Sequence, residues 1–149
     1  MSLLCVTTRI WFLIPFQVPG TDPPKSHLAS SEVEIGMGIH NEPGHSRVSP
    51  VPPLRTLVAQ LIDYIVNTND PERSFIPFKN DGRDKVALMV NNLGGVSELE
   101  LTGIVNAATE VLGERNIGIE RVLSGCFMVG GSRSPRFASS CTDITLSID

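Results

Sequence analysis

Apolar residues recur with two different periods along this chain, and the two periods predict a mixture of helices and strands. Residues 54–65 carry apolar side chains three and four positions apart, which is the spacing of an amphipathic helix. Residues 101–112 repeat that spacing after Ser97 and Glu100, a pair that is typical of a helix N-terminus. Residues 33–39 instead alternate apolar residues with glycine or glutamate, which predicts a strand.

Two further segments complete the predicted order of elements. Residues 85–91 form a short, nearly continuous apolar run of the kind found in buried strands, and residues 117–128 are the next strand candidate. The order strand, helix, strand, helix, strand favours an α/β fold. We expect a mostly parallel or mixed sheet with the helices packed on it.

The two ends of the chain are less regular than its middle. Residues 18–25 hold three prolines and a glycine, so we expect no regular structure across residues 1–31. Residues 46–53 hold three more prolines and read as a loop. Near the end, residues 143–148 alternate in a way that predicts a short strand at the edge of the sheet.

Composition and charge exclude several classes of function. A chain of 149 residues with a net charge of −4 and no basic cluster lacks the electrostatic footprint of a nucleic-acid-binding protein. Its longest apolar run, residues 10–16, is interrupted by Pro15 and is far shorter than the roughly 20 residues of a membrane span. Cys5, Cys126 and Cys141 form neither a disulfide framework nor a thiolate metal site, so we expect reduced thiols and a cytoplasmic protein.

The strongest candidate site follows the strand predicted at residues 33–39. His40 falls where that strand should end, which is where ligands bind in α/β sheets. Gly36, Gly38 and Gly44 allow the backbone and a ligand to approach closely, and Glu42 is near enough to orient the ring. An imidazole there is suited to act as a base, a metal ligand or a nucleophile toward a carbonyl carbon. The alternative is a tight turn whose histidine only hydrogen-bonds the backbone.

Two other patterns are weaker. Residues 91–95 open a helix with glycines, as anion-binding turns do, but the Gly-Lys-Ser/Thr ending of a nucleotide-binding loop is missing, so a plain turn is favoured. His27, His40 and His45 with Glu42 match no zinc-binding spacing, and we expect no metal site.

The two glycine-containing segments resemble one known family. Residues 32–44 read EVEIGMGIHNEPG and resemble the E-x-E-x-G-x-G-I-H-x-E-P-G segment of the substrate-binding K domain of dihydroxyacetone (glycerone) kinases. Residues 86–95 read VALMVNNLGG and resemble the V-A-L-x-V-N-N-L-G segment further along that domain. Residues 18–20 and 125–128 fit the same pattern. The resemblance covers residues 17–128 and corresponds to the second subdomain of a K domain.

The resemblance implies a chemistry for the first site. Enzymes of that family phosphorylate dihydroxyacetone to dihydroxyacetone phosphate, in glycerol and triose metabolism. By resemblance, His40 would bind the substrate covalently as a hemiaminal, and Gly38, Glu42 and Gly44 would form the substrate loop. ATP and Mg²⁺ would be bound by a separate L domain, present in cis or in trans. K domains of the family pair, so a homodimer is also implied.

The sequence departs from the family in several places. The motifs G-G-G-S-G-H-E-P and N-Y-x-G-D, which complete the substrate site in that family, do not occur in these 149 residues. Residues 1–16 and 129–149 do not resemble the family. We therefore expect a truncated K domain without kinase turnover of its own. The alternatives are a non-catalytic carbonyl-binding or regulatory module, and a truncated inactive gene product.

Overall fold

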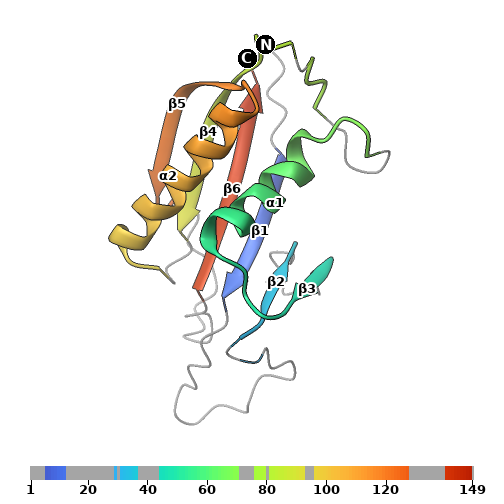
Figure 1. Cartoon of the computed structure of the whole chain (residues 1–149). Helices are drawn as coiled ribbons and strands as arrows, with labels where there is room; N and C mark the ends of the chain where they lie inside the picture. The colour runs from blue at the N-terminus through green and yellow to red at the C-terminus, as the bar shows by residue number, and fades with distance from the viewer. Residues whose placement is uncertain are drawn as a thin grey trace.

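In the part of the chain that is described, two helices pack on a six-stranded sheet (Figure 1). The computed structural model describes residues 6–12, 29, 31–36, 44–70, 76–79, 81–92, 96–127 and 140–148. The strands are β1 (Val6–Phe12), β2 (Val33–Ile35), β3 (Ser46–Val48), β4 (Lys85–Asn92), β5 (Gly118–Gly125) and β6 (Ser140–Ile148). The helices are α1 (Leu54–Val66) and α2 (Glu98–Glu114). Neither helix is long and apolar enough to cross a membrane.

The sheet is mixed, in the strand order β3-β2-β1-β6-β4-β5. Only β4 and β5 pair in parallel, as expected for strands joined by a helix, and every other pair is antiparallel. The α/β class and the mixed sheet are thus confirmed, whereas the parallel alternative holds for one pair alone. The reason is that β1 and β6, from the two ends of the chain, lie side by side in the middle of the sheet.

The two helices form where the apolar spacing predicts them. In α1 the apolar stripe is buried, and Leu57, Leu61 and Ile65 are at most 1% exposed. In α2 the predicted capping box is present: the Ser97 hydroxyl accepts from the Glu100 amide, and the Glu100 carboxylate accepts from the Ser97 amide. Local sequence signals therefore fix both helices.

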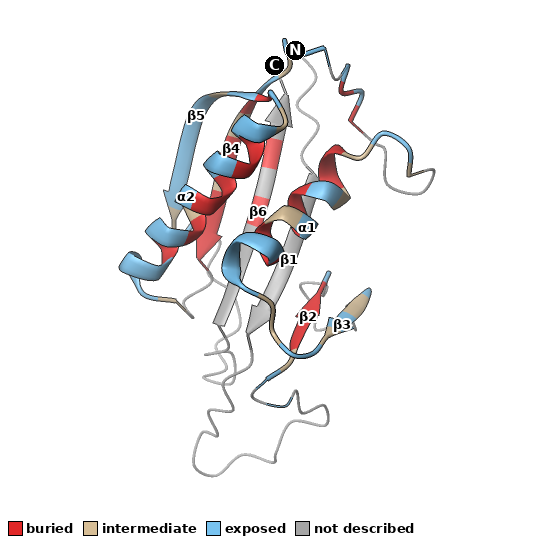
Figure 2. Cartoon of the chain, in the orientation of Figure 1, coloured by how far each residue is buried: buried red, intermediate tan, exposed pale blue. Residues whose placement is uncertain are grey.

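The core lies between the helices and the sheet. Figure 2 shows buried residues on β4 and on the inner sides of α1 and α2, while β5 at the edge is mostly exposed. Ile144 and Leu146 of β6 are 0% exposed and join this core. Ile76 and Phe78, from the segment after α1, are also buried in it.

Three segments differ from the sequence predictions. The N-terminal region, expected to lack regular structure, contributes β1, and the loop expected at residues 46–53 begins with β3. The strand expected at the sheet edge is β6, which lies between β1 and β4. β1 and β6 pair with each other across nearly the whole chain, for example Val6 with Leu146, and β3 has only three residues, so short-range patterns miss all three. The domain boundaries after residues 16 and 128 stay a prediction.

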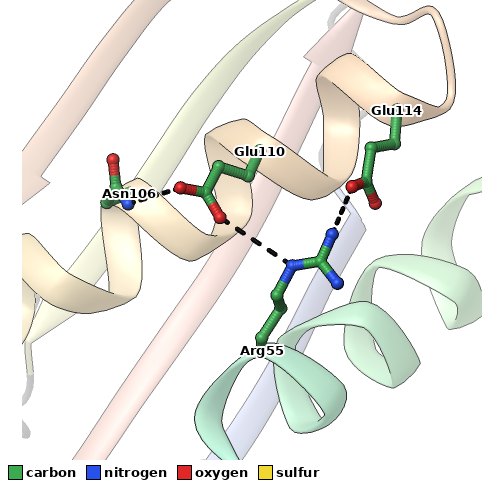
Figure 3. Close-up of polar contacts among 4 residues, drawn as sticks. All are labelled: Arg55, Asn106, Glu110 and Glu114. Carbon is green, nitrogen blue, oxygen red and sulfur yellow. Dashed lines mark hydrogen bonds and ion pairs between the residues drawn. The ribbon is translucent and has the colours of Figure 1, made fainter.

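Polar contacts link the two helices at the surface (Figure 3). The Arg55 guanidinium pairs with the Glu110 carboxylate at 3.8 Å and with the Glu114 carboxylate, and Asn106 donates to Glu110 at 2.9 Å. Because these side chains are exposed, the pairs stabilise the fold by little, roughly 1 kcal/mol or less each.

Candidate functional site

The β2–β3 hairpin closes the loop that holds the first predicted site. Val33 pairs with Val48 and Ile35 with Ser46, and the His45 amide donates to the Ile35 carbonyl at 2.8 Å. The two ends of the loop are therefore held side by side.

Four loop residues were predicted to bind substrate, and the structure describes one of them. Gly38, His40 and Glu42 lie outside the described residues. Gly44 is described and is half-buried at the end of the loop. The assignment of His40 therefore stays a prediction, and the geometry of the site begins at the two ends of the loop.

Glycine is required at both ends of this loop, for different reasons. Gly36 has a φ of +82°, in the left-handed region that side chains other than glycine rarely adopt. At Gly44 the constraint is space: a Cβ atom would lie 2.6 Å from the Ile35 carbonyl oxygen and 2.6 Å from Glu34 Cγ. The glycines that the sequence singled out at these positions thus have a structural purpose.

Glu34 is a buried acid at the base of the same loop. Its residue is 4% exposed, its Oε1 accepts a hydrogen bond from the Gly44 amide at 2.9 Å, and Arg47 Nε lies 3.6 Å from that oxygen. Sequence reasoning missed Glu34, because the alternation of β2 assigns it to the polar face of a half-exposed strand. The only signal in the sequence is an acid placed between two strongly apolar residues.

His45 connects the hairpin to α1. Its exposed ring meets the edge of the Tyr64 ring at a centroid distance of 5.9 Å and an interplanar angle of 83°. In the portion described, no group of three or more His, Cys, Asp or Glu side chains is placed to hold a metal ion. His27, His40 and Glu42, the other members of the metal site considered above, fall outside that portion.

Two asparagines of the second motif, at the end of β4, are buried and hydrogen-bonded. Asn91 and Asn92 are 2% and 3% exposed. The Asn92 amide group donates to the Val96 carbonyl at 2.7 Å, and Asn91 Oδ1 accepts from the Phe127 amide at 2.8 Å. These buried side chains contact Val96, just before α2, and Phe127, just after β5. The glycines of the motif lie outside the described residues, so the choice between a plain turn and an anion-binding turn stays a prediction.

The N-terminus of α2 is occupied by its own acidic residues. Glu98 and Glu100 lie in the first turn, and the Ser97 backbone and side chain lower the pKa of the Glu100 carboxyl. A nucleotide phosphate would meet two carboxylates there instead of free amides. The described residues of this turn therefore do not fit the phosphates of ATP.

The described ends of the two motif strands, Ile35 and Asn92, lie apart in the sheet. Ile35, Ile10, Thr142 and Asn92 lie in one row of paired residues across β2, β1, β6 and β4. With strands about 4.8 Å apart, three steps separate β2 from β4 by about 14 Å. The two strands also run in opposite directions.

A shallow hollow of about 330 Å³ lies at the C-terminal ends of the two helices. It contains none of the predicted site residues. Its basic side chain, Arg115, already donates to Asp63 at 2.9 Å and to the Ala59 carbonyl at 3.4 Å. The residues that line it are Val66, Asn67, Thr68, Asn69, Arg115 and Ile117.

Comparison with known proteins gives consistent matches. The family model described as the Dak1 domain matches residues 8–131. The dihydroxyacetone kinase of Pichia angusta is 42% identical over 125 residues, which are 83% of this chain and 20% of that protein. The dihydroxyacetone kinase of Komagataella pastoris is 45% identical over 67% of this chain and 16% of its own length. The triokinase/FMN cyclase of Rattus norvegicus is 42% identical over 78% of this chain and 19% of its own length. The chain thus spans about a fifth of these relatives.

Solved structures share the fold. The dihydroxyacetone kinase operon co-activator Dha-DhaQ matches with a TM-score of 0.72 at 21% identity, over 97% of this chain and 39% of its own. The dihydroxyacetone kinase of C. freundii, in complex with AMP-PNP and Mg²⁺, matches with a TM-score of 0.61 at 22% identity, over 97% of this chain and 23% of its own. At these identities the likeness establishes the fold.

Proposed function

Because this chain belongs to the Dak1 domain family, we propose that its β2–β3 hairpin presents the substrate loop of a dihydroxyacetone kinase. In this proposal His40, at the middle of the loop, binds dihydroxyacetone. The observation that carries it is the closed base of the loop, where Ile35 and His45 are joined by a 2.8 Å hydrogen bond and Gly44 is fixed to Glu34. A loop pinned in this way can hold one side chain in place for a ligand.

The proposed chemistry is addition to a ketone. A neutral imidazole nitrogen of His40 forms a bond to the central carbon of dihydroxyacetone while the carbonyl π bond breaks. The ring N–H proton is lost and the former carbonyl oxygen gains a proton, so the product is a hemiaminal and no group leaves. Glycerol has no carbonyl and is excluded. Protonated imidazole has no free electron pair, so binding should weaken as the solution is acidified.

Phosphorylation requires a nucleotide site in addition to this loop. The family resemblance assigns ATP and Mg²⁺ to an L domain, and the C. freundii kinase structure contains AMP-PNP and Mg²⁺. We propose that the 149 residues alone form no dihydroxyacetone phosphate and that an L domain, in cis or in trans, restores the reaction.

Product should appear only when purified L domain and ATP are added, and His40→Ala should abolish it. Formation of dihydroxyacetone phosphate without the L domain would contradict the proposal that the reaction needs both domains. Pairing of two copies stays a prediction.

Carbon NMR of dihydroxyacetone labelled at the central carbon tests the binding step. The purified chain should give a protein-bound tetrahedral carbon signal, and His40→Ala should remove it while leaving the cooperative unfolding transition unchanged. A chain that unfolds cooperatively but gives no tetrahedral signal would show that this loop does not bind the ketone as proposed.

A further inference from the structure

We propose that Glu34 is a positioning residue, whose buried carboxylate fixes the place of the loop that carries His40. This inference rests on the function proposed above for His40. Glu34 lies on β2, which is paired on one side with β1 and on the other with β3, so its backbone is a fixed point of the sheet. From there its side chain reaches Gly44, ten residues later, and accepts the Gly44 amide at 2.9 Å.

The contact with Glu34 fixes the second end of the loop, at Gly44. His40 is four residues after Gly36 and four residues before Gly44, the two anchored glycines. Because an extended chain spans at most about 3.6 Å per residue, fixing Gly44 confines the His40 backbone to within about 14 Å of it. The neighbouring bond from the His45 amide to the Ile35 carbonyl, at 2.8 Å, closes the same end. Without the Glu34 contact, that end would be held by the His45 bond alone.

Burying the Glu34 carboxylate costs free energy, so a gain in stability does not by itself explain why an acid stands at this position. A carboxylate removed from water is stabilised only by close partners, and apolar replacements of buried ion pairs are often neutral or favourable. Among the described residues, its partners are the Gly44 amide and Arg47, whose side chain is 50% exposed and 3.6 Å away. An apolar residue would serve packing at least as well. The distinctive property of the acid is its directed bond to the loop.

Two substitutions of similar size separate the hydrogen-bond acceptor of Glu34 from its charge and its volume. Glutamine keeps the length and one oxygen acceptor but removes the charge. Leucine keeps most of the volume but removes the acceptor. Volume matters here because Glu34 Cγ approaches Gly44 closely, since a Cβ on Gly44 would lie 2.6 Å from it.

Three substitutions of Glu34 and one control separate these contributions. Binding is measured by titrating the full chain with labelled dihydroxyacetone and following the tetrahedral carbon signal. Stability is measured as the midpoint of urea unfolding of each variant. Glu34→Ala and Glu34→Leu should each weaken binding by about tenfold, the equivalent of one charge-assisted hydrogen bond. Glu34→Gln should stay within about threefold of wild type, because it restores the acceptor. The control Glu120→Gln removes an exposed pair with Lys85 on β5, at the other edge of the sheet, and should bind as wild type does.

The outcomes distinguish a failure of the positioning role of Glu34 from a failure of the substrate-binding role of His40. If folded Glu34→Leu binds as tightly as wild type, Glu34 does not position the loop, whatever happens to Glu34→Ala. If Glu34→Ala fails to fold, Glu34→Leu and the exchange of the Gly44 amide with solvent decide. That amide should be protected in wild type and in Glu34→Gln and should lose protection in Glu34→Leu, and equal protection in all three would overturn the contact. A wild-type chain without any tetrahedral signal would overturn the assignment of His40, and with it this one.

Discussion

The helix-covered half of the molecule and the β2–β3 hairpin are held together by different interactions. In the first, α1 and α2 bury continuous apolar stripes against β4 and β6, and Leu61, Leu88 and Leu146 are 0% exposed. In the second, two three-residue strands close a loop through a glycine contact and one buried carboxylate. The difference indicates that the stability of the fold is concentrated in the first region. The proposed chemistry depends on the second.

The largest expected effect is the loss of a core side chain from the helix-covered half. Leu61→Ala removes a fully buried side chain of α1 and should lower the free energy of unfolding by about 2–5 kcal/mol. Leu54→Ala, on the same helix but 43% exposed, should cost about 1 kcal/mol or less. Urea unfolding measures both. Equal costs would mean that α1 does not pack as described.

Gly44→Ala tests the hairpin with one added methyl group. The new Cβ would press on the Ile35 carbonyl oxygen and on Glu34, so we expect a loss of about 1–3 kcal/mol and no binding of labelled dihydroxyacetone. The matched control is Gly113→Ala in α2, where no atom lies within 4 Å of the added Cβ. There the same substitution should stabilise the protein by up to about 1 kcal/mol and leave binding intact. If both substitutions have the same sign, the close approach at Gly44 is wrong.

The capping box of α2 should make part of the stability depend on pH. The Ser97 contacts lower the pKa of Glu100 below its ordinary value of 4.5, so the folded state favours the ionised carboxylate. This contribution is complete above the ordinary value and is lost as the pH falls through the lowered value. Glu100→Gln should flatten the dependence of unfolding on pH below about 4.5, with no change in ligand binding near neutral pH. If the free energies of unfolding of Glu100→Gln and wild type fall in parallel below about pH 4.5, the capping contact is contradicted.

The smallest effect is expected at Ser46, in the hairpin itself. Its hydroxyl oxygen is buried without a hydrogen-bond partner among the described residues. Because an unsatisfied buried hydroxyl is unfavourable, Ser46→Ala should leave stability unchanged or raise it by about 1 kcal/mol. Thermal unfolding checks this, and a clear loss of stability would show that the hydroxyl has a partner.

The two regions also differ in how far the sequence predicts them. Sequence patterns within about fifteen residues predict both helices, the cap at Ser97 and strand β4. They do not predict the positions of β1 and β6, because Val6 pairs with Leu146 across nearly the whole chain, and β3 is too short to show a period. Glu34 was missed for a different reason: the alternation of β2 assigns it to a polar face, although its partner amide is only ten residues away. The loop glycines were recognised, while the role of His40 stays a prediction.

An amide NMR titration of the full chain with dihydroxyacetone tests the central claim most directly, since it shows which region meets the ligand. The account predicts saturable shifts in the amides of Gly36, Gly44 and His45, with the helix-covered half unchanged and with no shifts from glycerol. Shifts clustered on α1, α2 or the hollow beside Arg115, or equal shifts from glycerol, would contradict it.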